Sequence, residues 1–207
     1  MNKPKFIFSV AAFFVVCLFS VTNFSAQTET QQRQAEPSYE VVLHLLTASN
    51  ISSDKNSVPQ SLSNVVKKLK TNYTFSNYRL ASTYLGRIAN TGNFEFKIVS
   101  NEASQDQENY VPIFSEWSLV ALRNLPNEKG QNSIQFQSFR FGRRVPVRTA
   151  TLKDESGKTS DVVNYEQIGL NMQKFSVSEN VPTIVGSLST AKPDELMFLV
   201  LTVKPAE

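Results

Sequence analysis

The sequence predicts an α+β protein that is mostly β, with a small βαββ module at residues 38–100 followed by an antiparallel β-sandwich at 110–205. Two observations predict this class. Most of the chain consists of short runs of β-branched and aromatic residues separated by turn residues, and one stretch alone has helical periodicity. A polar loop at 101–109 is the best boundary between the two parts.

The first part is predicted from its order of patterns. Residues 39–48, YEVVLHLLTA, are expected to form a strand that is apolar on both faces except at Glu40 and His44. An amphipathic helix is expected over residues 60–71, where four residues recur at the i, i+3, i+4, i+7 spacing: Leu62, Val65, Val66 and Leu69. Strands at 73–88 and 94–99 follow, joined by the turn residues Asn90-Thr91-Gly92-Asn93. The order is therefore βαββ.

The second part contains the clearest alternation in the chain. In residues 133–141, Ile134 and Phe136 share one face, and Phe139 with Phe141 continue it only if the phase changes near Ser138. A β-bulge there accounts for the change. A further strand at 145–152 leads into a charged hairpin tip at 153–158.

The C-terminal segment is predicted to form a β-meander. Residues 170–177 and 181–188 are expected to pair as a hairpin around a polar turn. After a second turn at 192–195, residues 196–203, LMFLVLTV, have almost no alternation. Such a run is typical of a central strand that is covered on both faces.

This segment also carries a resemblance to a known family. The residues concerned are Ser178-Glu179-Asn180, Thr183-Ile184-Val185-Gly186, Asp194-Glu195 and 198–205. Their order of turns and strands resembles the closing strands of the outer-membrane secretins, and the βαββ order is similar to the small modules in secretin periplasmic domains. Because the chain is too short for a full secretin barrel, the resemblance implies an accessory protein or a detached module.

The N-terminus has the layout of a secretory signal peptide, residues 1–26. Lys3 and Lys5 precede an apolar run at 6–21, and the small residues Ser25 and Ala26 precede a polar stretch. Residues 27–37 are then a disordered linker. The N-terminal segment would engage the membrane during export and would anchor the protein there if it were not cleaved. Lipidation of Cys17 is a further alternative.

Composition excludes several kinds of chemistry. Cys17 is the single cysteine. If the signal peptide is cleaved, the mature chain has no cysteine, which excludes disulfides, thiolate zinc sites and cysteine nucleophiles together. His44 is the single histidine and lies in an apolar strand, where a packed, hydrogen-bonded side chain is expected. No catalytic, cofactor or metal motif is present. Loss of Lys3 and Lys5 would lower the formal net charge from +3 to +1, so the charge gives no case for nucleic-acid binding.

One local feature points to a partner. Four arginines are interleaved with two phenylalanines, and these arginines are the predicted partner-binding residues: Arg140, Arg143, Arg144 and Arg148. Planar guanidinium groups suit an acidic protein, an anionic glycan or a phospholipid head group. The alternative is that they form the ordinary polar face of a hairpin around Gly142.

The sequence thus predicts a non-enzymatic protein, exported to the periplasm or beyond the cell, that binds or assembles with an envelope protein. In line with the resemblance, it would be accessory to an outer-membrane secretion or pilus system. The alternative is a periplasmic hydrolase or a carbohydrate-binding β-sandwich. That alternative requires carboxylates and aromatic rings that converge in one concavity.

Overall fold

The computed structural model describes residues 37–206 with gaps at 52–56, 101–111 and 127–131 and at positions 154, 156, 158, 191 and 193. The predicted signal peptide and nearly all of the predicted linker lie outside the described residues. The elements, in chain order, are β1 (Ser38–Ser49), η1 (Gln60–Leu62), α2 (Ser63–Asn72), β2 (Asn77–Ala89), β3 (Asn93–Ser100), β4 (Ile113–Val120), β5 (Arg123–Pro126), β6 (Asn132–Lys153), β7 (Thr159–Ser178), β8 (Thr183–Ser189) and β9 (Glu195–Pro205).

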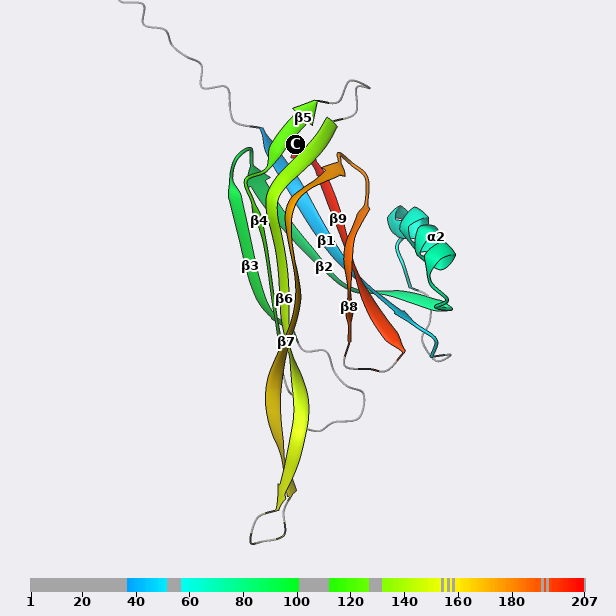
Figure 1. Cartoon of the computed structure of the whole chain (residues 1–207), viewed down its shortest axis with the longest axis vertical. Coiled ribbons are helices and arrows are strands. Elements are labelled where there is room, and N and C mark those ends of the chain that lie inside the picture. Colours follow the sequence, from blue (N-terminus) through cyan, green and yellow to red (C-terminus); the bar gives the residue numbers. More distant parts are fainter. Residues whose placement is uncertain are drawn as a thin grey trace, which may run out of the picture. The chain divides into compact units, whose positions relative to one another are not determined.

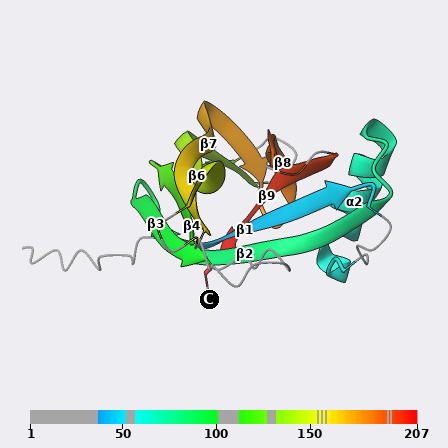
Figure 2. The same ribbon diagram turned by 90° about the horizontal axis from the view of Figure 1, so that it is seen from below.

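Two antiparallel sheets are built from these strands (Figures 1 and 2). The first sheet has the order β2-β1-β9-β8. In the second sheet, β3 pairs with β4, and β4 pairs with β6. The strand β5 pairs with the first residues of β6, and β7 pairs along the other edge of β6. The predicted class, α+β and mostly β, is confirmed.

The two predicted modules are interleaved in space. β1 of the predicted βαββ module lies between β2 and β9, and β3 of the same module is the edge strand of the second sheet. Residues 36–207 form one compact unit, in which each sheet contains strands from both predicted modules. The physical reason is that β1 and β9 are apolar and satisfy their backbone groups by pairing with each other over their whole lengths.

The predicted hairpin between residues 170–177 and 181–188 is wrong. β7 pairs with β6 in the second sheet, whereas β8 pairs with β9 in the first. The turn between them therefore leads the chain from one sheet to the other, with Asn180 at a φ of 61°. Alternation defines the two faces of a strand but not its neighbour, and this is why the sequence pattern could not supply the pairing.

Two hydrophobic cores lie on opposite faces of the first sheet. The core between the sheets contains Leu43, Leu199 and Trp117, all buried. The second core contains Leu46 and Phe198, and it is covered by Leu62 of η1 and by Val65 and Leu69 of α2, all buried. The amphipathic helix and the two-sided burial of residues 196–203 are thus both as predicted.

The phase change predicted near Ser138 is present but has a different cause. Phe136 and Phe139 are both fully buried, yet the pairing of β6 with β7 keeps one register from Phe136 to Ser138. On β7, Lys174 has a φ of 51°. It lies between Phe175 and Gln173, which are the partners of Phe136 and Ser138. This left-handed backbone is uncommon for a lysine, and the irregularity at this point involves no inserted residue.

Beyond Arg144, β6 and β7 pair only with each other among the described residues, from Val145↔Glu166 to Lys153↔Thr159. They form a two-stranded ribbon that continues the second sheet (Figure 1). The strand predicted at 145–152 is therefore the second half of one long strand, β6. Its predicted hairpin tip at 153–158 joins Lys153 to Thr159.

Replacing Leu199 by alanine is expected to lower the free energy of unfolding by about 2–5 kcal/mol, because a fully buried leucine in a central strand leaves a cavity when it is truncated. Chemical denaturation measures the change. Leu85→Ala is the matched control, since Leu85 is 60 % exposed, and it is expected to stay within about 0.5 kcal/mol. Equal losses in the two variants would contradict the central position of β9.

Candidate functional site

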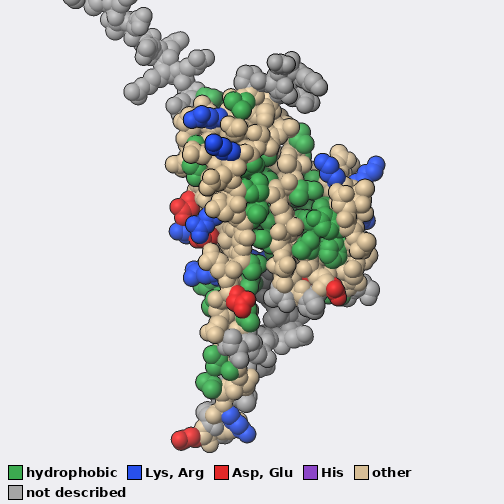
Figure 3. Space-filling model, in the orientation of Figure 1, with side chains coloured by type: hydrophobic (Ala, Val, Ile, Leu, Met, Phe, Trp, Pro, Cys, Tyr) green, Lys and Arg blue, Asp and Glu red, His purple; other side chains and the backbone are tan. Residues whose placement is uncertain are grey.

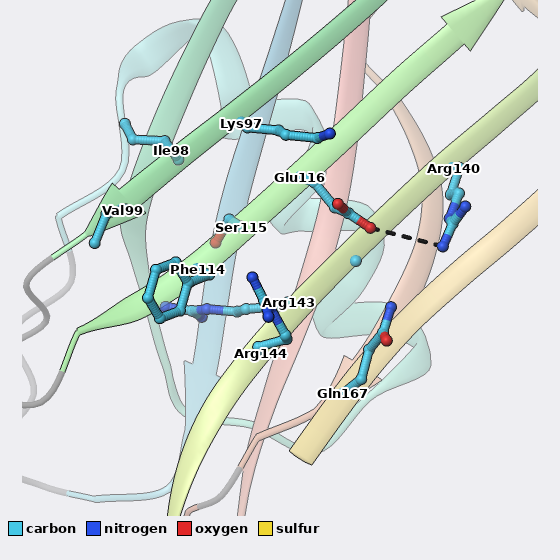
Figure 4. A pocket seen from close by; sticks show the side chains of 11 residues that line it. Lys97, Ile98, Val99, Phe114, Ser115, Glu116, Arg140, Arg143, Arg144 and Gln167 are labelled. Atoms are coloured by element: carbon cyan, nitrogen blue, oxygen red, sulfur yellow. Dashed lines mark ion pairs between the residues drawn. The ribbon is translucent and has the colours of Figure 1, made fainter. Parts of the chain in front are cut away.

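A pocket of about 410 Å³ opens on the second sheet (Figure 4). Strands β3, β4, β6 and β7 contribute its lining, which contains four cationic side chains and one carboxylate. The lining residues are Lys97, Ile98, Val99, Phe114, Ser115, Glu116, Arg140, Gly142, Arg143, Arg144 and Gln167. Its volume is within the range of small-ligand sites.

Strand register explains why these residues meet. Lys97 on β3 lies opposite Glu116 on β4, which in turn lies opposite Gly142 on β6. Gly142 has no side chain to fill the space beside Glu116, and a Cβ there would stand 3.2 Å from the Glu116 Cγ and 3.4 Å from the Gln167 Nε2. Glycine at this position therefore keeps the centre of the pocket open.

Three of the four predicted arginines line the pocket: Arg140, Arg143 and Arg144. Successive residues of a strand point to opposite faces, so Arg140 and Arg144 share the outer face while Arg143 points between the sheets. The side chain of Arg148 lies outside what the structure describes. Its backbone belongs to the ribbon, opposite Val163, beyond the part of β6 that β4 covers.

The two outer arginines have partners that leave them open to solvent. An Arg140 Nη2 lies 3.6 Å from the Glu116 Oε1, and both side chains are exposed by more than a third. The Arg144 guanidinium carbon lies 4.8 Å from the centre of the Phe114 ring, a cation–π contact. Both groups thus hold a defined position and still have N–H donors to offer.

An exposed ion pair flanks this arrangement. The Lys97 ammonium lies 2.8 Å from the Glu95 carboxylate. Its hydrogen bond lowers the pKa of Glu95, and the same bond raises the pKa of Lys97. Both groups therefore stay charged near neutral pH. Figure 3 shows basic and acidic side chains close together along this side of the second sheet.

Arg143 is different, because only 4 % of it is exposed. Its Nη1 donates to the Met197 sulfur of β9 at 3.9 Å, so it joins the second sheet to the first. A buried guanidinium needs several hydrogen bonds or charges around it. Arg143 is therefore a structural residue between the sheets and not part of an exposed basic patch.

Ser115 stands directly opposite Arg143 in the pairing of β4 with β6. It is 3 % exposed, and its Oγ has no hydrogen-bond partner among the described residues. A buried hydroxyl without a partner costs about 1–3 kcal/mol. Sequence patterns could not identify Ser115, Glu116, Lys97 or Gln167, because only the register of four strands brings these residues to the pocket.

His44 lies on β1, away from this pocket. Its Nδ1 is 3.0 Å from the Thr83 Oγ1 on β2, and the side chain is half-buried. Burial lowers the pKa of His44 below its ordinary 6.5. The prediction of a packed, hydrogen-bonded histidine is confirmed. Within the described ranges, no three His, Cys, Asp or Glu side chains are grouped as metal ligands would be.

No helix in the part of the chain that the structure describes has the length and apolar character to cross a membrane.

Comparison with known proteins gives little further information. No protein-family model matches the chain, and no curated protein matches it. Among solved structures, it is similar to the InvG secretin domain β-barrel of the Salmonella SPI-1 injectisome NC-base, with 9 % identity and a TM-score of 0.38 over 95 % of this chain and 68 % of that one. A TM-score this low does not establish a shared fold. The interpretation of the pocket therefore depends on its own geometry.

Arg143→Ala is expected to lower the free energy of unfolding by about 2 kcal/mol or more, because truncation leaves a cavity between the sheets. Arg144→Ala, one residue along the same strand, is expected to lose only about 0.5–1 kcal/mol from its exposed cation–π contact. Denaturant titration compares the two variants. Similar losses would contradict the assignment of Arg143 to the interior and Arg144 to the surface.

The lowered pKa of His44 makes stability depend on pH. The folded state binds a proton on His44 less readily than the unfolded state, so the free energy of unfolding is expected to fall as pH drops through 6.5. Denaturation between about pH 7.5 and pH 5.5 measures the slope. Since His44 is the single histidine, His44→Gln should reduce this slope. An unchanged slope would exclude His44 as its source.

Proposed function

We propose that the protein is exported to the cell envelope and acts there by binding an acidic partner protein through the pocket face of the second sheet. The observation that carries this proposal is the pair of exposed arginines on the outer face of the pocket, Arg140 and Arg144, which keep N–H donors to offer beside a single lining carboxylate, Glu116. Such a concentration of positive charge in a concave site attracts negative groups and orients them.

A hydrolase is the less favoured alternative. Glycoside hydrolysis uses two carboxyl groups about 5–9.5 Å apart, and the described pocket lining provides only Glu116, which already pairs with Arg140 at 3.6 Å. Catalysis by that route would need a second carboxyl group from elsewhere. The geometry is better suited to binding.

Carbohydrate binding by ring stacking is also less favoured. The aromatic side chain of the pocket is Phe114. Arg144 lies over its ring, and Tyr165 packs against it with ring centres 5.6 Å apart. The Tyr165 hydroxyl donates to the Pro112 carbonyl at 3.0 Å, which fixes Tyr165 there. Phe114 therefore serves to position Arg144 and offers little free face to a sugar.

A role beside an outer-membrane secretion or pilus system is part of this proposal. Its support is the resemblance of residues 178–205 to the closing strands of secretins. This resemblance does not identify a partner protein. Export rests on the layout of residues 1–26, with two lysines before an apolar run.

The proposal is tested by crosslinking the protein in its native envelope and identifying what is captured. The variant is Arg140→Ser with Arg144→Ser, and Arg143 is left intact because its loss would disturb the fold. The expected result is one specific acidic envelope protein with the wild type and at least a tenfold lower yield with the variant, since two guanidinium contacts are lost.

The matched control removes the same charge elsewhere. Arg123 on β5 and Lys192 in the turn before β9 are both exposed and do not line the pocket, so Arg123→Ser with Lys192→Ser should leave capture unchanged. If both double variants lose the partner equally, net charge and not the pocket face is responsible. Capture that is unaffected by Arg140→Ser with Arg144→Ser would overturn the proposed function.

A further inference from the structure

We infer that Arg144 is the main contact for the acidic partner and holds one of its carboxylates through two N–H groups at once, while Arg140 contributes mainly attraction between charges. This inference rests on the proposed function, and it names both the chemical group that is recognised and the residue that recognises it. Both arginines are exposed on the outer face of the second sheet, so one partner surface can reach them. They differ in the contacts that each already makes.

The guanidinium of Arg144 lies over an aromatic ring. Its carbon is 4.8 Å from the centre of the ring of Phe114, which is its cross-strand neighbour on β4 (Figure 4). This contact depends on the attraction between the positive charge and the electrons of the ring. A guanidinium has five N–H donors, and Phe114 has no side-chain oxygen to accept from them. The donors of Arg144 thus stay available to a partner.

The ring of Phe114 is itself held in place. Tyr165 on β7 packs against it, with the ring centres 5.6 Å apart and the ring planes at 67°. The Tyr165 hydroxyl donates to the Pro112 carbonyl at 3.0 Å. The support of Arg144 therefore passes through two rings to a hydrogen bond with the backbone. Because the guanidinium is positioned before the partner arrives, less side-chain entropy is lost when a carboxylate binds.

The neighbours of Arg144 across the sheet leave its charge uncompensated. In the strand register, Arg144 lies opposite Phe114 on one side and Gln167 on the other, and Val99 follows beyond Phe114. None of these three residues is acidic. Among the described residues, Arg144 has no ion pair, so its full charge can act on a carboxylate from outside.

Arg140 is in a different situation. Its Nη2 already lies 3.6 Å from the Glu116 Oε1, and its own row across the sheet contains Ser118 and then the acidic Glu95. A carboxylate of the partner would have to compete with Glu116 for this guanidinium. An exposed ion pair is weak, so Glu116 can be displaced, but the net gain at Arg140 is smaller than at Arg144.

The shape of the donor selects the group that binds. A guanidinium offers two parallel N–H groups in a fixed fork, which match the two oxygens of a carboxylate. A lysine at the same position would keep the positive charge and lose the fork. Arg144→Lys therefore separates recognition by geometry from attraction by charge, and Arg140→Lys is the same change four residues earlier on β6.

The test is the binding of a fluorescently labelled hexaglutamate peptide to the purified protein, followed by fluorescence anisotropy at low, constant ionic strength, where charge attraction is little screened. Saturable binding of hexaglutamate is expected, and none of hexaglutamine. Arg144→Lys is expected to weaken binding about tenfold, the effect of one lost hydrogen bond to a charged group. Arg140→Lys is expected to weaken it less than about twofold, because its pair with Glu116 leaves it less to contribute.

Two further variants complete the test. Phe114→Leu changes no charge and is expected to weaken hexaglutamate binding about threefold, because Arg144 loses the ring that positions it. Arg123→Lys is the matched control, since Arg123 is exposed and does not line the pocket, and it should leave binding unchanged. Thermal denaturation checks that each variant is folded.

Three results would overturn the inference: equal losses in Arg144→Lys and Arg140→Lys, unchanged affinity in Arg144→Lys, or no saturable binding of hexaglutamate. Capture in the native envelope separates this failure from that of the proposed function. If capture is lost in Arg140→Ser with Arg144→Ser but is the same in Arg144→Lys as in the wild type, charge alone is recognised; the inference then fails and the proposed function stands. Capture that is independent of both arginines removes the proposed function itself.

Discussion

Burial of β9 on both of its faces is the constraint on which the rest of the structure depends. Leu199 and Leu201 point toward the second sheet, while Phe198 and Val200 point toward α2. A strand with apolar side chains on both faces is stable only if both faces are covered. This requirement places α2 on one side and the second sheet on the other, and it brings the first and last strands of the described chain together.

The pocket is a consequence of how the second sheet meets this arrangement. β6 alternates between large apolar residues that enter the core and polar residues on the outer face, until Arg143 takes an inward position and contacts Met197 of β9. The core therefore becomes polar at this point, with Ser115 beside Arg143. On the outer face, Gly142 leaves room between Arg140 and Arg144. The same stretch of β6 thus joins the two sheets and forms the pocket.

The ribbon of β6 and β7 presents a different situation. From Val145 to Lys153 and from Thr159 to Glu166 the two strands pair only with each other in the described part of the chain. An isolated two-stranded hairpin is only marginally stable in water. This ribbon is attached to a well-packed sheet, which fixes its register at one end, and it carries exposed apolar residues such as Leu152.

The sequence by itself determined the local structure: the strands, the helix at 60–71, the two-sided burial of residues 196–203 and the phase change near Ser138. These depend on periodicity, which neighbours along the chain define. It also identified three of the pocket residues, Arg140, Arg143 and Arg144, because they are close in sequence.

Only the tertiary structure decided which strands pair and which arginines are exposed. The pairing of β1 with β9, and of β7 with β6 instead of β8, joins residues far apart in the chain, and many partners satisfy the same alternation. For the same reason Lys97, Ser115, Glu116 and Gln167 could not be selected in advance. Arg143 and Arg144 are adjacent and chemically identical; one is buried and the other exposed because successive side chains of a strand point to opposite faces.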